Sequence, residues 1–215
     1  MPINPAPVIV GISGGSGCGK TYILNKLIHE YPETEICLLS QDHYYKPLHT
    51  HAIDENGSVN WDLPEGIDEG RLFNDIMQLI AGKQVEKWEY TFNHPEFEPS
   101  LMLFKPAPIL VIEGLFVFHL ERIAGMLDLR VFIEANESLR LERRMIRDMA
   151  ERSLSREQIL YQWNYHVKPA HEHYLTPYIS SCDLTILNEI GEPSLVSLHH
   201  AIDIIKSSKS YLSEK

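Results

Sequence analysis

Short apolar runs alternate with longer amphipathic stretches along most of this chain. The apolar runs occupy residues 8–12, 36–39, 109–112, 129–133 and 184–187. Each is four or five residues long and has few or no polar positions, which is typical of a strand buried on both faces of a parallel sheet. The pattern therefore predicts five strands of one parallel sheet.

The stretches between the runs have helical periodicity. They cover residues 20–30, 67–81, 137–151, 155–167 and 193–207. Asn136 is a good N-cap for the third stretch, and Ser155 with Gln158 forms a capping box for the fourth. Alternating strands and helices predict an α/β protein with a doubly wound parallel sheet flanked by helices, whose ligands bind at the carboxyl ends of the strands.

Residues 83–104 interrupt this alternation. They contain short extended segments at 85–90, 91–94 and 101–104, with prolines at positions 95 and 99. This composition predicts a small β-hairpin excursion over the sheet. At 215 residues, we expect one domain over residues 1–215, with residues 83–104 as a hairpin insertion.

Composition and charge narrow the partners and the compartment. The chain has 19 Lys and Arg against 30 Asp and Glu, a net charge of −11, which is opposite to the charge of a nucleic-acid-binding surface. No apolar run is long enough to span a bilayer, and the N-terminus does not resemble a signal peptide. The three cysteines form no Cys-x-x-Cys pair. We expect a cytoplasmic protein without nucleic-acid or membrane partners.

One segment matches the phosphate-binding pattern G-x-x-x-x-G-K-[ST]. It consists of Gly14, Gly15, Ser16, Gly17, Cys18, Gly19, Lys20 and Thr21. It lies between the first predicted strand and the first predicted helix, so its N–H groups and the helix N-terminus can surround phosphate oxygens. Lys20 can reach the β- and γ-phosphates, and the Thr21 hydroxyl can bind Mg²⁺. The sequence predicts binding of ATP or GTP rather than a flexible Gly/Ser turn.

Two carboxylates follow predicted strands on the same edge of the sheet. Asp42 comes soon after residues 36–39 and can accept a proton from a hydroxyl that attacks the γ-phosphate. From spacing alone, a turn or N-cap aspartate explains Asp42 equally well. Glu113 directly follows residues 109–112 and is a candidate second Mg²⁺ ligand, the alternative being an ordinary charge at a strand end.

Arginines are concentrated on one predicted helix and its end. Positions 140, 143, 144 and 147 share a helix face, and Arg152 follows. They can converge on a triphosphate and stabilise charge on the transferred group. The alternative is a solvated face paired with Glu137, Glu142, Asp148 and Glu151. Because the chain is otherwise short of positive charge, the sequence favours a functional cluster.

Other residues are candidates for binding a phosphate acceptor. Asp62 can accept hydrogen bonds from two neighbouring sugar hydroxyls. Tyr90 and Phe92 can form the wall for an aromatic ring, although packing of the hairpin core explains them as well. The pair His171 and His173 lacks an evident third ligand, so we do not expect it to bind a metal.

Several motifs in this order resemble the uridine kinase (uridine–cytidine kinase) family of P-loop kinases. The resemblance covers about residues 7–187. It includes the phosphate-binding loop, Ser40-Gln41-Asp42-His43-Tyr44-Tyr45, Trp61-Asp62-Leu63-Pro64, Glu89-Tyr90-Thr91-Phe92, Ile112-Glu113-Gly114, residues 140–148, Glu151-Arg152, Gln162 and Val167-Lys168-Pro169.

The resemblance implies phosphoryl transfer from ATP or GTP to the 5′-hydroxyl of uridine or cytidine, in pyrimidine salvage. It implies that Asp42 is the catalytic base, acting with Lys20 and Arg147. It implies that Arg144, Arg147 and Arg152 belong to a lid over residues 140–170 near the phosphates, and that Thr21 and Glu113 hold Mg²⁺. The implied acceptor-binding residues are Tyr45, Asp62, Tyr90, Phe92, Arg144 and Gln162. A homo-oligomer, a tetramer or dimer, is also implied.

Two departures from the family pattern fall on the acceptor side. His94 lies one position earlier than the family's histidine and no arginine follows it, and Leu154 stands where the family has an arginine. Hydrogen-bond donors that recognise one edge of a base discriminate strongly between acceptors. These two changes therefore affect which acceptor the protein prefers. The alternatives are a kinase for another small hydroxylated compound, such as a sugar phosphate or a pantothenate-like acid, and an ATPase or nucleotide switch. The guanine-binding motif Asn-Lys-x-Asp of a GTPase is absent.

Overall fold

The computed structural model describes residues 6–91, 98–189 and 193–213. Its centre is a five-stranded sheet in the order β2-β5-β1-β6-β7, and every neighbouring pair is parallel. The strands, in sheet order, are Ile36–Ser40, Ile109–Glu113, Val8–Ser13, Leu129–Glu134 and Leu184–Leu187. All five predicted strands are confirmed.

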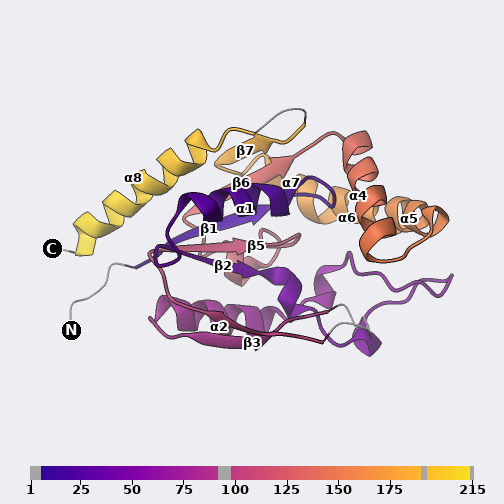
Figure 1. Cartoon of the computed structure of the whole chain (residues 1–215), viewed down its shortest axis with the longest axis horizontal. Coiled ribbons are helices and arrows are strands. Elements are labelled where there is room, and N and C mark those ends of the chain that lie inside the picture. Colours follow the sequence, from indigo (N-terminus) through magenta and orange to yellow (C-terminus); the bar gives the residue numbers. More distant parts are fainter. Residues whose placement is uncertain (1–5, 92–97, 190–192, 214–215) are drawn as a thin grey trace.

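Helices cover both faces of the sheet (Figure 1). On one face, α1 (Lys20–Glu30) and α8 (Val196–Ser213) contribute buried side chains such as Leu27 and Ile202. On the other, α2 (Glu69–Ile80) and α3 (Glu121–Ala124) contribute Ile76 and Ile123. The central strands β1 and β5 are buried along their whole length, because each has a strand on both sides and helices above and below.

The predicted capping residues define where the helices begin. Asn136 accepts a hydrogen bond from the Leu139 N–H at the start of α4 (Glu137–Glu151). The Ser155–Gln158 capping box is present at the start of α5 (Arg156–Gln162). Asp68 caps α2, which therefore starts two residues later than residues 67–81 predict.

The helix predicted over residues 155–167 continues further than expected. After α5 come a π-helical turn at Trp163–Val167, α6 (Lys168–Ala170), a second π-helical turn at His171–Leu175 and α7 (Thr176–Ile179). Prolines in α6 and α7 follow the two π-helical turns; a proline lacks the N–H that continues an α-helical hydrogen-bond pattern. The α5 end of this chain of helices lies against α4 (Figure 1).

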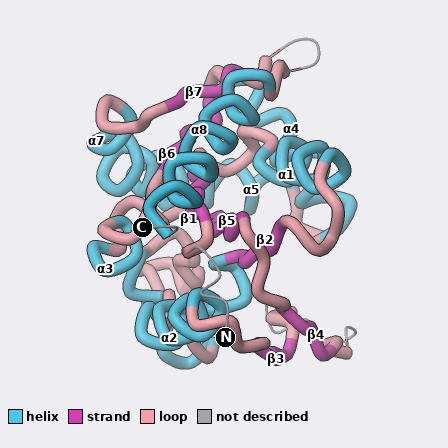
Figure 2. Tube along the Cα trace, turned by 90° about the vertical axis from the view of Figure 1, so that its left-hand side faces the viewer, coloured by secondary structure: helices cyan, strands magenta, loops and turns pink. Residues whose placement is uncertain are grey.

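The predicted hairpin is also present. Strand β3 (Val85–Trp88) pairs antiparallel with β4 (Leu101–Phe104), on the β2 side of the molecule (Figure 2). The extended segment expected at 91–94, with Phe92 and His94, falls almost entirely outside the described residues. Within the described residues, we find no helix with the length and apolar character needed to cross a membrane.

Candidate active site

A cleft of about 540 Å³ opens at the carboxyl ends of β1, β2 and β5. It brings together most of the predicted site residues: Gly15, Ser16, Gly17, Gly19, Lys20, Thr21, Asp42, Tyr45, Asp62, Glu113, Arg144, Arg147, Arg152 and Gln162. Gly14 and Cys18 belong to the same loop but are not among the lining residues, and neither is Tyr90. The sheet geometry thus gathers side chains that are up to 147 positions apart (15 to 162) at one edge.

The phosphate-binding loop requires glycine at two positions where the backbone turns sharply. Gly17 and Gly19 have φ angles of 78° and 88°, in the left-handed region. A Cβ atom on Gly17 would lie 2.1 Å from the carbonyl oxygen of Arg140, and one on Gly19 would lie 2.1 Å from Nδ2 of Asn188. Both backbone conformation and neighbours therefore exclude larger residues, and the loop has a defined shape.

Side chains from the far half of the chain hold this loop from behind. Nε of the buried Arg140 donates to the Ser16 carbonyl at 3.1 Å, and Nδ2 of Asn188 donates to the Cys18 carbonyl at 2.8 Å. Arg143 donates to the Asn188 carbonyl at 2.9 Å and to the Cys18 carbonyl at 3.4 Å, and it also lines the cleft. Arg140 and Arg143 thus support the loop, a role that the spacing of the arginines did not separate from phosphate binding. Asn188 was not predicted; its only sequence signal is its position directly after β7.

The remaining arginines surround one buried carboxylate. Asp148 on α4 is 0% exposed and lies 3.1 Å from Arg144, 2.7 Å from Arg147 and 3.6 Å from Arg152. Asp148 neutralises one of the three positive charges, so the three arginines and Asp148 together have a net charge of +2 beside the cleft. The sequence left open whether these arginines form a solvated, acid-paired face; the acid that pairs with them is buried, and all three arginines line the cleft.

Arg144 joins three parts of the site. It donates to the Ser16 hydroxyl at 2.9 Å and to Oε1 of Gln162 at 2.9 Å, in addition to its ion pair with Asp148. Burial lowers the pKa of Arg144, while Asp62 and Asp148 oppose this change. The residue therefore connects the phosphate-binding loop with α4 and α5.

Ser40, at the end of β2, connects the Glu113 carboxylate of β5 with the turn that carries Asp42. Its hydroxyl donates to the Glu113 carboxylate, and Ser40 is also the cap of the turn Gln41–Tyr44, accepting from the Asp42 N–H at 3.2 Å. This cap holds the start of the turn at the end of β2, and the exposed Asp42 side chain lines the cleft. Burial raises the pKa of Glu113 to about 7, with repulsion from Asp42 adding to the rise and Lys20 opposing it.

The oxygen atoms near Lys20 suit a hard cation. Thr21 and Glu113 both line the cleft, with Asp42 beside them. No group of three or more His, Cys, Asp or Glu side chains among the described residues could hold a metal ion by itself. This donor set fits Mg²⁺, which usually binds through one or two protein oxygens together with substrate phosphates and water.

Aromatic rings line the part of the cleft beside Asp62. The Tyr45 ring lies 5.6 Å from Trp61 and 5.7 Å from Tyr90, and His51 lies 4.4 Å from Trp61, measured between ring centroids. Tyr45 and Trp61 line the cleft, while Tyr90 contacts both rings without lining it. Burial raises the pKa of Asp62, and Arg144 opposes the rise. Trp61 was not predicted as a site residue, although it adjoins Asp62 in the sequence.

Three further lining residues shape this part of the cleft. Val59 and Leu154 are apolar, and His166 comes from the π-helical turn after α5. Leu154 thus lies in the cleft at the position where the family arginine was expected. The histidine was missed because nothing in its local sequence distinguishes it from a core histidine.

A parallel sheet with a phosphate-binding loop between β1 and α1, facing arginines and carboxylates, defines a P-loop small-molecule kinase. The sequence profile of the Phosphoribulokinase / Uridine kinase family matches residues 9–191. The chain belongs to this family.

Individual relatives agree on the fold and differ in their named activities. The chain is 30% identical over 209 residues to the uridine kinase of Streptococcus thermophilus (strain ATCC BAA-491 / LMD-9), covering 97% of this chain and 96% of the relative. D-glycerate 3-kinase from Cryptococcus neoformans var. grubii superposes with a TM-score of 0.60 at 12% identity, covering 88% of this chain and 89% of that one. Phosphoribulokinase from Rhodobacter spheroides gives 0.60 at 14% identity, covering 86% and 71%.

Proposed function

We propose that this protein transfers the γ-phosphoryl group of ATP or GTP to the 5′-hydroxyl of uridine or cytidine. The observation that carries the proposal is the composition of the cleft: Asp42, Asp62 and an aromatic wall share one cavity with the phosphate-binding loop. The relatives named uridine kinase, 30% identical over nearly the whole chain, support the nucleoside as acceptor.

The donor triphosphate would bind along residues 14–21. Backbone N–H groups of the loop, Lys20 and the arginines around Asp148 would bind its β- and γ-phosphate oxygens and stabilise the charge that develops during transfer. Thr21 and Glu113 are the residues that would hold Mg²⁺, and the ion, when bound, supplies further neutralisation of phosphate charge.

The acceptor would bind between Asp62 and the aromatic wall. The Asp62 carboxylate can accept hydrogen bonds from two ribose hydroxyls, and the rings of Tyr45 and Trp61 offer apolar surface to a pyrimidine. Asp42 would take the proton of the 5′-hydroxyl as its oxygen forms a bond to the γ-phosphorus. The bond between the γ-phosphorus and the β–γ bridging oxygen breaks, and ADP or GDP leaves.

A second candidate is a kinase for another small hydroxylated metabolite. Leu154 is the observation in its favour, because an apolar side chain occupies the position of a substrate-binding arginine. A sugar phosphate or a pantothenate-like acid would be phosphorylated with the same donor site. An ATPase or nucleotide switch is less well supported, since Asp62 and the aromatic wall form an acceptor site that hydrolysis does not need.

An acceptor screen tests the proposal. The purified protein is incubated with Mg²⁺-ATP and, separately, with uridine, cytidine, other nucleosides, sugar phosphates and pantothenate, and both ADP and phosphorylated acceptor are quantified. We expect equal amounts of ADP and nucleoside monophosphate with uridine or cytidine. Transfer only to a non-nucleoside would establish the second candidate, and ADP release without any phosphorylated acceptor would establish an ATPase.

A further inference from the structure

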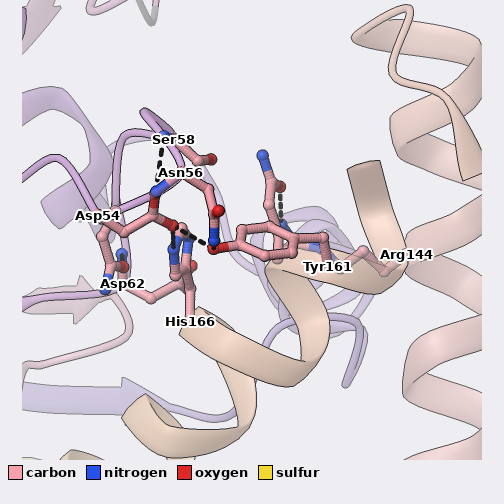
Figure 3. Close-up of polar contacts among 9 residues, drawn as sticks. Asp54, Asn56, Ser58, Asp62, Arg144, Tyr161 and His166 are labelled. Atoms are coloured by element: carbon pink, nitrogen blue, oxygen red, sulfur yellow. Dashed lines mark hydrogen bonds and ion pairs between the residues drawn. The ribbon is translucent and has the colours of Figure 1, made fainter. Parts of the chain in front are cut away.

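One carboxylate, Asp54, makes several of the contacts that hold the loop before Trp61. Asp54 accepts hydrogen bonds from the N–H groups of Asn56 and Ser58 at 2.9 Å, from the Tyr161 hydroxyl at 2.8 Å and from Nε2 of His166 at 2.7 Å (Figure 3). Burial opposes the charge of Asp54, but these hydrogen bonds outweigh it and lower its pKa to about 2. Asp54 is therefore a fixed anion next to the imidazole of His166.

His166 uses only one of its two ring nitrogens within the protein. The side chain is 3% exposed and lines the cleft together with Asp62. Nε2 contacts Asp54, whereas Nδ1 has no hydrogen bond to any part of the chain that the structure describes. Because His166 lines the cleft, a ligand bound there can supply the hydrogen bond that the protein does not give to Nδ1.

The Asp54 carboxylate determines which nitrogen carries the proton. A carboxylate accepts from N–H, so Nε2 keeps its hydrogen and Nδ1 of the neutral ring is an acceptor with a free lone pair. His166 and Asp62 line the same cleft. Together, Nδ1 and the Asp62 carboxylate offer two acceptors to one bound molecule.

We propose that His166 binds the acceptor directly, with Nδ1 accepting a hydrogen bond from one sugar hydroxyl while Asp62 binds the neighbouring hydroxyl. Asp54 is then a positioning residue that fixes the tautomer and the orientation of the imidazole. This inference rests on the proposed function for its substrate class, a ribonucleoside with vicinal hydroxyls.

The alternative is that Asp54 and His166 only fasten the loop to α5. That attachment already has two other contacts: Asn56 Nδ2 donates to the Tyr161 hydroxyl at 2.7 Å, and Tyr161 donates to Asp54. Neither contact needs an imidazole, and neither Asn56 nor Tyr161 lines the main cleft. The histidine, in contrast, faces the same cavity as Asp62.

The variants His166→Leu, His166→Gln and Asp54→Asn test the proposal, with His200→Leu as the matched control. His200 is exposed on α8 and does not line the cleft. Initial rates are measured with uridine, 2′-deoxyuridine and 3′-deoxyuridine, and KM for ATP is measured in parallel. His166→Leu removes the acceptor nitrogen and leaves the sugar hydroxyl without a hydrogen-bond partner. We therefore expect this variant to raise KM for uridine about tenfold.

Comparing KM for uridine with KM for the two deoxy analogues distinguishes direct binding by His166 from a purely structural role. With the deoxy analogue that lacks the bound hydroxyl, wild type and His166→Leu should have nearly the same KM, because the hydrogen bond is absent in both cases. His166→Gln, which keeps an acceptor oxygen, should recover part of the uridine KM. Asp54→Asn should raise the same KM about threefold, because it weakens orientation rather than removing the contact. KM for ATP and all values for His200→Leu should stay unchanged.

Equal losses for uridine and both deoxy analogues, or an equal rise in KM for ATP, would overturn the inference in favour of a structural role. If the wild type phosphorylates a different compound and not uridine, the proposed function fails, and the same variants are measured with that compound. A raised KM for it then supports the role of His166, and an unchanged KM contradicts that role. A wild type that phosphorylates no acceptor overturns both proposals.

Discussion

The proposed donor half and the proposed acceptor half of the cleft are built in different ways. The centre of the proposed donor half is one continuous segment, residues 14–21, whose shape follows from left-handed glycines and from the start of α1. The acceptor half combines side chains from several separate segments, among them Tyr45, Asp62, Leu154 and His166. Backbone geometry gives the phosphate-binding loop its shape, whereas the acceptor half depends on how separate side chains pack together.

This difference affects what each half can tolerate. Replacing Gly17 would bring a Cβ within 2.1 Å of the Arg140 backbone, so the donor half resists change. In the acceptor half, Leu154 replaces the arginine of the family pattern while the phosphate-binding loop keeps its complete motif. We infer that acceptor preference can change within this fold while the donor chemistry remains.

The largest effect is expected from Lys20→Met in the donor half. Lys20 lines the cleft and is held by the Gly14 carbonyl at 2.7 Å. Losing its charge should lower kcat by about two to three orders of magnitude, because it stabilises the transferring phosphoryl group. KM for the acceptor should change little. Steady-state kinetics with Lys83→Met as the exposed control would test this, and a raised acceptor KM with normal kcat would contradict the division into halves.

Asp148→Asn should disturb the arginine group and with it the stability of the fold. The substitution leaves Arg144, Arg147 and Arg152 without their shared buried anion. Breaking a buried ion pair by removing one partner typically costs about 3 kcal/mol. Urea unfolding should show this loss, with Glu151→Gln on the same helix as the control. Unchanged stability would show that the arginines do not depend on Asp148.

Glu113 predicts a pH dependence of stability in the ligand-free protein. Its pKa rises from an ordinary 4.5 to about 7 on folding, so between these values the folded state binds more protons than the unfolded state. Stability from this group is therefore present below pH 4.5 and is lost as the pH rises through 7. Glu113→Gln should remove this slope and be more stable than wild type at pH 8 by about 3 kcal/mol.

Urea unfolding at pH 5.5 and pH 8 measures the effect of Glu113. The exposed Glu121→Gln provides the control, since it changes charge without changing the cleft. A Glu113→Gln protein that keeps the wild-type slope would assign the pH dependence to other groups.

Leu154→Arg should give a smaller effect, confined to the acceptor half. Leu154 lines the cleft, and an arginine there supplies a donor that the family pattern contains. If the acceptor is a nucleoside, kcat/KM for uridine should rise about tenfold, the value of one charge-assisted hydrogen bond. KM for ATP should not change. No rise for uridine, together with a fall in activity toward a sugar phosphate or a pantothenate-like acid, would favour the second candidate function.

The sequence predicted the sheet and the position of the phosphate-binding loop well because both depend on local pattern. Apolar runs identify all five strands, and the glycine spacing identifies the loop. Asn188 and His166 were missed because their roles come from tertiary contacts with Cys18 and Asp54, which no local pattern contains. Arg140 was grouped with the phosphate-binding arginines, since helical spacing does not distinguish a side chain that supports the loop from one that faces the cleft.

The central claim is that Asp42 activates an acceptor hydroxyl within a cleft that binds ATP independently of it. It is tested most directly by measuring, for Asp42→Asn and wild type, both the rate of nucleoside monophosphate formation and the affinity for a non-hydrolysable ATP analogue. We expect the rate to fall by about two orders of magnitude, with unchanged affinity for the analogue. Near-normal turnover at saturating nucleoside would contradict the assignment of Asp42 as the base and, with it, this account of the cleft.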